Sequence, residues 1–350
     1  MVEEPLVSII ILNWNRPLLT IKCLESLRNI KYNNIKIIIV DNGSVDGSVK
    51  AITDHLVSNY NKKNIYINEK GGFDSALESG DPELRRSASD DQIAVYLLAN
   101  ELNLGFSGGC NIGMKFALLD AKVSYVLLLN NDITTSEDFL NCLVKVGEDK
   151  ERNAIIGPKV LVHAEDGSDI IDFAGGGMDL RKGIAYHHRA GEKENGMPEE
   201  NAAVEYIEGS CMLIKRSIFP VIGYFDTDFF AYYEETDYCF RAKRSGYDSV
   251  YCPSSRVWHK TSFSTHPEIR EYFLTRNRIK FVRKHGSPND ILLFYLYFFM
   301  YDTFRVLKRC AVEKRDLNLY RSFLFGAHDG FSRKGDRYFQ KVMGRSSPEK

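Results

Sequence analysis

Paired cysteines and an excess of charge of either sign are both missing from this chain. The seven cysteines are scattered, form no CxxC pair and are odd in number, which favours reduced thiols in a reducing compartment over a disulfide framework. The 46 basic and 47 acidic residues leave a net charge of −1, so the composition offers no general attraction for nucleic acid or an anionic membrane. Local charged patches are still compatible with this balance.

Long hydrophobic runs and internal repeats are absent as well. The apolar stretch 6–12 follows two acidic residues and is cut off by the sequence NWNRP, so it predicts a strand and not a signal peptide. The run ILLFYLYFFMY, residues 291–301, is too short to cross a bilayer, which takes about 20 residues. A hydrophobic content of 44% in 350 residues predicts a globular protein with one large domain or two smaller ones.

Apolar runs and helix-like periods alternate over the first 135 residues. We expect strands at 7–13, 36–41, 93–99 and 125–130, and helices near 17–29, 46–59 and 108–120. Continuous apolar strands between amphipathic helices predict a parallel α/β sheet that is covered on both faces. Each strand ends in polar residues, and such sheets bind ligands at the carboxyl ends of their strands. The sequence therefore predicts a polar binding edge.

The later segments read differently. Residues 69–92 are polar without an apolar period and predict a surface loop. The sequence AIIGPKVLV from residue 154 predicts a strand, the Gly- and charge-rich segment 163–200 is typical of loops, and 208–219 predicts a strand followed by a helix. Beyond residue 267 the chain is helical in pattern and rich in aromatic and basic residues. We expect the second half to cover the sheet and to supply an acceptor surface.

A thin candidate metal site follows the strand at 125–130. The sequence LLNND ends in Asp132, its one anion, and Mg²⁺ or Mn²⁺ binds oxygen ligands and takes one or two carboxylates plus substrate phosphates. Taken alone, this stretch would equally suit a capped strand end. His259 in VWHK would alone be a packed or solvent-facing histidine, but beside an under-ligated Asp132 it becomes a candidate second ligand.

Two further stretches could contact an anionic nucleotide. Asp41 ends the predicted second strand, where its carboxylate can accept an N–H of a base. The sequence NLGFSGGCNIGM, residues 103–114, lets the backbone approach a ligand and then opens a helix whose N-terminal amides favour anions. Its spacing is not the dinucleotide fingerprint, which argues against a nicotinamide enzyme, and a plain Gly-rich loop stays an open alternative.

Three acidic residues stand at the start of a predicted amphipathic helix in YYEETDYCFRAKRSGY. Glu234, Glu235 and Asp237 fall within four positions. The helix dipole accounts for at least one acid in a first turn, but three exceed what capping requires. A carboxylate whose pKa is raised by burial and by like-charged neighbours can serve as a general base.

Six stretches, taken in order, resemble family 2 glycosyltransferases of the GT-A fold, closest to the rhamnosyltransferase-like and galactofuranosyltransferase-like branch. They are VSIIILNWNR, IIIVDNGSVDGS, NLGFSGGCNIG, LLLNNDI, YYEETDYCFRAKRSGY and VWHK, and the resemblance covers residues 6–285. It implies a GT-A α/β fold with a Rossmann-like, mostly parallel central sheet flanked by helices and a C-terminal helical extension. The implied catalytic domain is 1–265, with a nucleotide-binding half 1–135 and an acceptor-side half 136–265, followed by a helical region 266–350.

The resemblance also implies roles for individual residues. Asp132 matches the last position of a DxD-like metal motif, His259 a second metal ligand, and Glu235 the general base, with Glu234 and Asp237 beside it. Two features depart from the family pattern, because Asn130 and Asn131 replace acids and the base position holds Glu instead of Asp. The nucleotide-sugar-binding residues implied are Asn13, Asn15, Arg16, Asp41, Asn42, Gly43, Asn103, Gly105, Phe106, Asn111 and Asn131.

The implied activity is metal-dependent inverting transfer. With Mn²⁺ or Mg²⁺ bound, a sugar would move from a nucleoside diphosphate-sugar, dTDP-rhamnose or a UDP-sugar, to a hydroxyl of a glycan or polyprenyl-linked acceptor in surface-polysaccharide or cell-wall synthesis. Two alternatives are a catalytically silent sugar-nucleotide binder or scaffold and a nucleotidyltransferase. The second would need a phosphate-binding loop after the first strand, where NWNRPLLT has no glycine.

The aromatic run 291–301, with basic residues close behind, allows three interpretations. It could be an interfacial membrane anchor near a lipid-linked acceptor, a helix buried under the catalytic domain, or a homodimer contact. We expect a cytoplasmic protein, peripheral on the inner face of the membrane in the first case, and no nucleic-acid partner.

Overall fold

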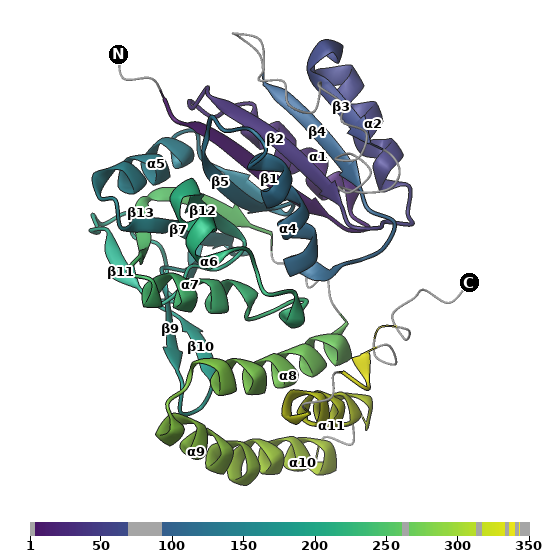
Figure 1. The fold of residues 1–350 in the computed structure, drawn as a ribbon, viewed down its shortest axis with the longest axis vertical. Helices are drawn as coiled ribbons and strands as arrows, with labels where there is room; N and C mark the ends of the chain where they lie inside the picture. Colours follow the sequence, from purple (N-terminus) through teal and green to yellow (C-terminus); the bar gives the residue numbers. More distant parts are fainter. Residues whose placement is uncertain are drawn as a thin grey trace.

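The computed structural model describes residues 4–68, 93–260, 266–312, 317–332, 336–339 and 343. The predicted surface loop 69–92 lies outside the described residues. The described chain forms an eleven-stranded sheet with helices on both faces and a separate layer of helices below it (Figure 1). The fold class predicted from the sequence, a mixed α/β protein with a mostly parallel central sheet, is confirmed.

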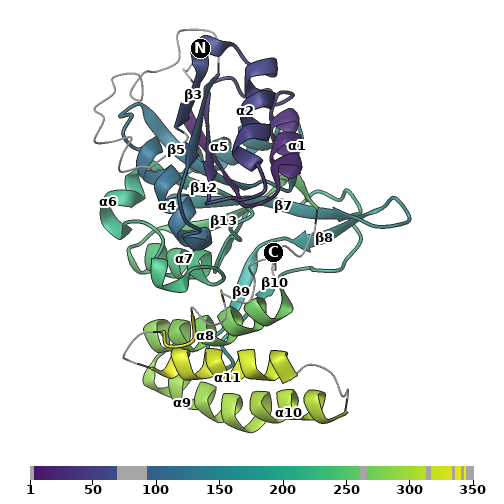
Figure 2. The ribbon, with the colours of Figure 1, turned by 90° about the vertical axis from the view of Figure 1, so that its right-hand side faces the viewer.

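Five parallel strands form the N-terminal half of the sheet, in the order β3-β4-β2-β1-β5. Their central members are apolar and buried on both faces, which is why they appear in the sequence as unbroken hydrophobic runs. Helices α1 and α2 cover one face and α4 the other (Figure 2). The elements are β1 (Leu6–Asn13), α1 (Pro17–Leu27), β2 (Ile35–Asp41), α2 (Ser48–Asn59), β3 (Ile65–Asn68), β4 (Ala94–Ala99), α4 (Gly105–Ala117) and β5 (Val123–Asn130).

Two glycines let α4 lie close against the sheet. A Cβ atom on Gly109 would stand 2.4 Å from the Leu12 side chain, and one on Gly113 would stand 2.4 Å from Ile10. Because Ile10 and Leu12 are two positions apart on β1, they point to the same face. The glycine-rich sequence thus seats the helix on the sheet as well as opening it.

The second half of the sheet is mixed. β12 lies antiparallel between β5 and β7, while β13 runs parallel to β7. The segment 163–200, expected to be loop, contains three strands, of which β9 and β10 form a hairpin. The elements are β6 (Ile133–Thr135), α5 (Phe139–Asp149), β7 (Asn153–His163), β8 (Asp169–Phe173), β9 (Gly176–Asp179), β10 (Ile184–His187), β11 (Ala202–Val204), β12 (Cys211–Lys215), α6 (Phe219–Ile222), α7 (Glu234–Arg244) and β13 (Asp248–His259). Short 3-10 helices occupy Lys62–Asn64, Arg216–Ile218 and Thr227–Phe229.

The C-terminal residues form the expected helical extension. It comprises α8 (Pro267–His285), α9 (Pro288–Tyr297), the π-helix η5 (Phe298–Asp302), α10 (Thr303–Val312) and α11 (Leu317–Phe331). The layer has its own core, to which Ile279, Phe294, Phe298 and Phe323 belong. The β9–β10 hairpin and α7 join it to the sheet (Figures 1 and 2). Within the described ranges, no helix is both long and apolar enough to span a membrane.

Candidate functional site

Strand pairing brings Asp132 and His259 together. β6 begins directly after Asp132 and runs antiparallel to the end of β13, where His259 stands opposite Ile133. The backbone N–H of Lys260 donates to the carbonyl of Asp132 at 2.9 Å, which fixes the register at this end. As a result, Nε2 of His259 lies 3.2 Å from Oδ1 of Asp132. The two residues proposed to share a metal ion are therefore adjacent in space.

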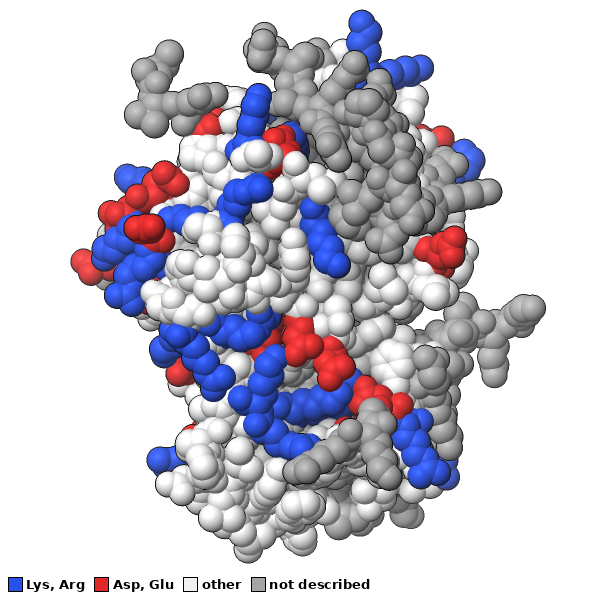
Figure 3. Space-filling view, in the orientation of Figure 1, with Lys and Arg blue, Asp and Glu red and all other residues white. Residues whose placement is uncertain are grey.

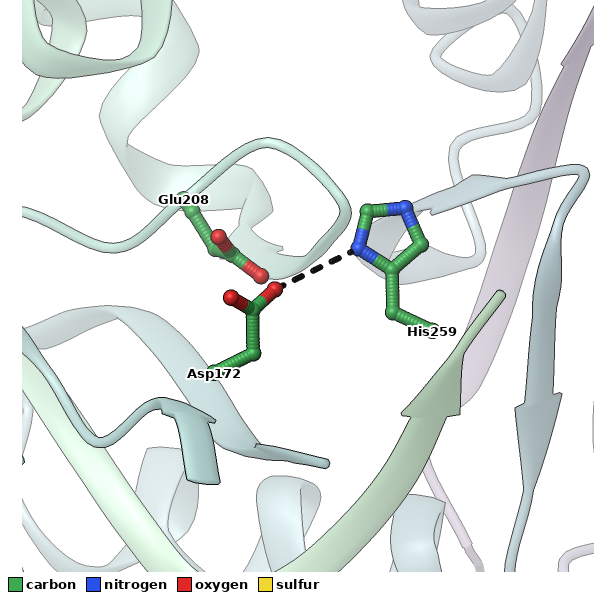
Figure 4. Close-up of side chains that lie close together, drawn as sticks. All are labelled: Asp172, Glu208 and His259. Atoms are coloured by element: carbon green, nitrogen blue, oxygen red, sulfur yellow. Dashed lines mark ion pairs between the residues drawn. The ribbon is translucent and has the colours of Figure 1, made fainter. Parts of the chain in front are cut away.

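Two further carboxylates, those of Asp172 and Glu208, lie on the other side of the His259 ring. Its Nδ1 lies 3.7 Å from Oδ2 of Asp172, and Glu208 lies beside Asp172 (Figure 4). Ligand atoms of Asp172, Glu208 and His259 all lie within 4.8 Å of one another. His259 thus has acidic neighbours at both ring nitrogens.

Asp172 and Glu208 are site residues that the sequence did not indicate. Asp172 belongs to β8, where the pairing with β7 shifts register between Val160 and Leu161, and such an irregularity re-aims a side chain. Glu208 lies in the connection between β11 and β12 and accepts a hydrogen bond from the Ser210 hydroxyl. Neither placement follows from a local sequence pattern, because both depend on pairing between strands that are distant in sequence.

The charges of this cluster are strongly shifted by their surroundings. Burial alone would lower the pKa of His259, but the carboxylates of Asp132 and Asp172 outweigh it and raise that pKa to about 10. Burial raises the pKa of Glu208, against the effect of His187 and His259. The His259 ring lowers the pKa of Asp172. The His259 ring thus lies between carboxylates, and these negative surroundings would also favour a divalent cation.

Two atoms of the cluster lack a hydrogen-bond partner. Oδ1 of Asp132 and Nδ1 of His259 are buried atoms that make only ion-pair contacts, to Nε2 of His259 at 3.2 Å and to Oδ2 of Asp172 at 3.7 Å, without a hydrogen bond to the described residues. Buried polar atoms are normally satisfied, so such an exception calls for a ligand or another explanation. Carboxylate oxygens with one imidazole form a donor set that suits Mn²⁺ or Mg²⁺. The residues present therefore fit a divalent cation.

The polar ends of β1 and β2 form a closed hydrogen-bond network. Nδ2 of Asn13 donates to Oδ2 of Asp41 at 2.7 Å, and the backbone N–H of Ser44 donates to Oδ1 of Asp41 at 2.9 Å. The Thr20 hydroxyl donates to Oδ1 of Asn13 at 2.7 Å, and Nδ2 of Asn131 donates to the Thr20 hydroxyl at 3.1 Å. Asp41 is 1% exposed, so its contacts in this structure are to the protein.

Asn42 ties the second strand to the glycine-rich turn. Its Nδ2 donates to Oδ1 of Asn103 and to the carbonyl of Gly105, both at 3.0 Å. Gly43 and Gly105 have positive φ angles of 75°, and a Cβ on either would meet backbone atoms below 3 Å, at 2.6 Å and 2.4 Å respectively. These positions require glycine for steric reasons, whatever they bind.

The remaining residues implied in nucleotide binding differ in surroundings. Asn111 is buried and exchanges two hydrogen bonds with the backbone of Phe225, at 2.9 and 3.0 Å. Asn15, with a φ of 53°, accepts from the backbone N–H of Val45 at 2.9 Å, and Arg16 precedes α1. The contacts of Asn111 explain its burial without a ligand, and its predicted role in nucleotide binding stays a prediction.

Glu234 and Glu235, the acidic pair at the start of α7, lie beside the loop that contains Glu208 and Gly209. A Cβ on Gly209, next to Glu208, would lie 3.8 Å from Cβ of Glu235 and 3.1 Å from the ring of Phe106. Burial, to which the Glu208 carboxylate adds, raises the pKa of Glu235 to about 7. Burial and then Glu235 raise the pKa of Glu234 well above its usual range. A proton held by Glu234 would leave the Glu235 carboxylate able to accept a proton near neutral pH.

A strained loop holds this pair in place. Phe230, Tyr232 and Tyr233 have positive φ angles of 62°, 70° and 73°, which are unfavourable for aromatic residues and occur at sites that the surrounding structure fixes. Nδ2 of the buried Asn277 in α8 lies 2.8, 2.7 and 2.8 Å from the carbonyls of Phe229, Ala231 and Tyr232. Helix α8 therefore fixes the backbone that leads to Glu234 and Glu235. No sequence motif indicates this role of Asn277.

Asp237 makes ion pairs with Arg241 of its own helix, α7, and with Lys284 and His285 of α8. It is fully buried and accepts from Arg241 at 2.8 Å and from His285 at 2.7 Å, and Nζ of Lys284 lies 2.8 Å away. Although burial alone would raise it, His285, Arg241 and Lys284 together lower the pKa of Asp237 to about 2. These contacts give Asp237 a structural role between helices, and the predicted catalytic role stays a prediction.

Comparison with known proteins finds a family model and several relatives that this chain resembles. The model of the family "Glycosyl transferase family 2" matches residues 8–80. The chain is 28% identical over 228 residues to a low-salt glycan biosynthesis hexosyltransferase of Haloferax volcanii, covering 62% of this chain and 71% of the relative. It is 28% identical over 190 residues to an N-acetylglucosaminyl-diphospho-decaprenol L-rhamnosyltransferase of Mycobacterium tuberculosis, covering 49% of this chain and 60% of that protein.

A solved structure shares the fold. The mannosyltransferase PcManGT from Pyrobaculum calidifontis, in complex with GDP-Man and Mn²⁺, aligns with a TM-score of 0.53 and 14% identity over 98% of this chain and 85% of that one. The GT-A fold and the predicted resemblance to rhamnosyltransferase-like proteins are confirmed. The predicted enzyme class, a glycosyltransferase, is confirmed by the family match and by the names of the relatives.

Proposed function

We propose that this chain, which carries a glycosyl transferase family 2 domain, is a metal-dependent inverting transferase that moves a sugar from a nucleoside diphosphate-sugar to an acceptor hydroxyl. The observation that carries the proposal is the meeting of His259 and Asp132 near an acidic pair whose base, Glu235, has a pKa raised to about 7. A scaffold protein would not need a carboxylate with a raised pKa beside a cluster of metal-ligating side chains.

Glu235 would act as the base of the displacement. Its carboxylate takes the proton of the acceptor hydroxyl, the oxygen forms a bond to the anomeric carbon, and the bond from that carbon to the diphosphate breaks, leaving its electron pair on the diphosphate. Attack from the face opposite the leaving group inverts the anomeric configuration. Glu234, by holding the shared proton, keeps Glu235 ionised near neutral pH.

The metal would lie at the Nε2 side of His259. Asp132 and His259 would hold it there, and Asp172 would fix the ring through Nδ1, because metal-bound histidines donate their other N–H to a carboxylate or carbonyl. When bound, Mn²⁺ or Mg²⁺ supplies positive charge for the leaving diphosphate. Alternatively, the ion would lie between Nδ1 of His259, Asp172 and Glu208. In that case Asp172 and Glu208, and not Asp132, would be the carboxylates essential for metal binding.

The donor and the acceptor belong to the classes that the relatives suggest. dTDP-rhamnose or a UDP-sugar as donor, and a glycan or polyprenyl-linked acceptor in surface-glycan assembly, are consistent with the names of the archaeal and mycobacterial relatives. We place the reaction in the cytoplasm, because the six cysteines whose side chains are described are free thiols. The nucleotide would bind at the ends of β1, β2 and β5, in the half that the family model matches.

A donor panel tests this proposal. The protein is mixed with Mn²⁺ and dTDP-, UDP- and GDP-sugars, and the release of nucleoside diphosphate is followed. We expect slow release with one donor, loss of that release when Mn²⁺ is chelated, and loss in Glu235→Gln with nucleotide binding retained. The exposed Glu200→Gln serves as a matched control. Binding without release for every donor, unchanged in Glu235→Gln, would instead identify a sugar-nucleotide-binding protein.

A further inference from the structure

An uncharged, solvent-facing apolar surface runs along α9, η5 and α10. We call it the apolar face. It consists of seven large side chains, all of them between 41% and 76% exposed: Leu292, Leu293, Leu296, Phe299, Met300, Tyr301 and Phe304. Scattered exposed apolar residues are normal on soluble proteins, but seven within thirteen positions form a continuous surface of the kind that marks an interaction site.

The helices are apolar on both sides. Phe294, Phe298 and Asp302 recur every four residues and are buried against the C-terminal core. The most exposed members of the apolar face, Met300 at 76%, Phe304 at 66% and Phe299 at 60%, lie outside that row. A surface helix of a globular protein normally turns polar residues outward, so this arrangement indicates that the outer side is covered in use.

The charges beside the apolar face have one sign. Arg305 and Lys308 are exposed, whereas Asp302 is 2% exposed and forms ion pairs with Arg278 at 2.7 Å and with Arg305 at 3.7 Å. The other carboxylate of this segment, Asp290, is occupied in capping α9 through Ser287. The exposed ionic groups of the segment 288–308 are thus basic, and they would be attracted to an anionic surface.

The face also lies where a flat surface can reach it. α9 and α10 form the outermost layer of the molecule, on the side away from the sheet (Figures 1 and 2). In the space-filling view the lower end of the molecule over these helices carries few charged side chains (Figure 3). Lys and Arg side chains gather instead where the sheet domain meets the C-terminal helices (Figure 3).

We propose that the apolar face is a membrane-docking surface that inserts into the headgroup region of an anionic lipid bilayer. Interfacial segments combine Leu and Phe on one side with Lys or Arg alongside, and lie in the plane of the membrane without crossing it. A lipid surface fits better than a second copy of the chain, because a twofold contact through this face would bring Arg305 and Lys308 near their own copies with no exposed carboxylate opposite them. The proposal does not depend on the identity of the sugar donor.

Vesicle co-sedimentation tests the proposal on the full chain. The probes are vesicles of phosphatidylcholine alone and of equimolar phosphatidylcholine and phosphatidylglycerol. We expect binding to the anionic vesicles, weakened by salt, and at least about a tenfold loss of partitioning in the triple variant Phe299→Ser, Met300→Ser, Phe304→Ser. The matched control Val57→Ser, Met197→Ser, Val221→Ser changes exposed apolar residues elsewhere and should bind as the wild type does.

A second variant separates charge from apolar contact. Arg305→Gln with Lys308→Gln should lose the preference for anionic vesicles while keeping the weaker binding to neutral ones. Circular dichroism and sedimentation velocity without vesicles check the fold and the oligomeric state of each variant. The proposal is overturned if the wild type binds neither vesicle, or if the triple variant binds as the wild type does. A dimer that the triple variant dissociates, with no vesicle binding by the wild type, would instead identify the face as a subunit contact.

Discussion

The two halves of the candidate site solve different physical problems. At the ends of β1 and β2, Asn13, Asp41 and Asn42 are buried. Asn13 donates a hydrogen bond to Asp41, and Asn42 donates one to the carbonyl of Gly105. Asp132, which precedes β6, and His259, at the end of β13, are partly buried and form an ion pair, and each has a buried atom without a hydrogen bond. A satisfied network stabilises a scaffold, whereas an unsatisfied charged cluster is costly unless a ligand completes it. The hydrogen bonds of the first half fix the shape of the strand ends where we propose that the nucleotide binds, and we propose that the second half holds the metal ion.

The largest effect should come from the base of the reactive half. Glu235→Gln keeps the shape of the side chain but removes its proton affinity, so we expect turnover to fall by about 10²–10⁴-fold. Substrate KM should change little, because the same atoms remain. The measurement is the steady-state rate with the donor identified by the panel. A rate within a few-fold of the wild type would show that the base is another residue.

The pH dependence of the wild type sharpens this prediction. Burial raises the pKa of Glu235 to about 7, and the base is active when ionised. The rate should therefore rise with pH up to about 7 and level off above it, with an approach to tenfold per pH unit on the acid side. The profile of Glu235→Gln should be flat over the same range. A wild-type rate that is already constant at pH 5 would be incompatible with this assignment.

The metal position is tested by comparing carboxylates on the two sides of His259. If the ion lies at Nε2, Asp132→Ala should abolish Mn²⁺-dependent nucleotide binding, and Asp172→Asn should weaken it by only about 10–100-fold, as loss of a ring-orienting group does. Calorimetric titration of nucleoside diphosphate with and without Mn²⁺ measures both. The reverse order, with Asp172→Asn the more severe, would move the ion to the Nδ1 side beside Glu208.

A smaller effect is expected from the α8 contact that holds the base. Asn277→Ala removes a donor to three loop carbonyls, of which that of Phe229 keeps the backbone N–H of Ala231 at 2.7 Å. Unsatisfied buried groups cost about 1–3 kcal/mol each, so with two carbonyls affected we expect the free energy of unfolding to fall by about 3 kcal/mol. The release of strain at Tyr232 and Tyr233 should lower turnover more than it raises KM. Chemical denaturation and kinetics test these effects, with the exposed Asn195→Ala as control. Unchanged turnover in a folded, destabilised variant would make Asn277 structural only.

The smallest effect should come from the scaffold half. Thr20→Val removes two hydrogen bonds, one that the hydroxyl donates to Asn13 and one that it accepts from Asn131, and each costs about 1 kcal/mol of unfolding free energy. The Mn²⁺ dependence of nucleotide binding should be unchanged. Thermal or denaturant unfolding, together with the same titration, checks both statements. A large loss of metal dependence would show that the two halves are coupled more tightly than the hydrogen bonds suggest.

Much of the fold could be predicted because parallel strands buried on both faces appear as unbroken apolar runs. β1, β2 and β4 each fall within one residue of the predicted ranges, and β5 begins two residues before its predicted range. β13 does not appear in the pattern, since its sequence DSVYCPSSRVWH is interrupted by Pro and Ser. The strands within 163–200 are short and partly exposed, which leaves no period to detect.

The candidate site divides in the same way. Asp132, Glu235 and His259 could be named from residue type and position beside a resembling motif, and the structure brings Asp132 and His259 together. Asp172 and Glu208 could not, because a register shift in β8 and the path between β11 and β12 place them. Single candidate ligands can be recognised in the sequence. Which residues complete the site depends on pairing between strands that are distant in sequence.

We propose that Asp132 and His259 together hold the cation on which nucleotide binding depends. Electron paramagnetic resonance of free Mn²⁺, titrated with protein in the presence and absence of nucleoside diphosphate, measures it most directly. We predict that wild-type protein removes the free Mn²⁺ signal when nucleotide is present, and that Asp132→Ala and His259→Ala each abolish this uptake while still folding. Uptake by His259→Ala equal to that of the wild type would contradict the account.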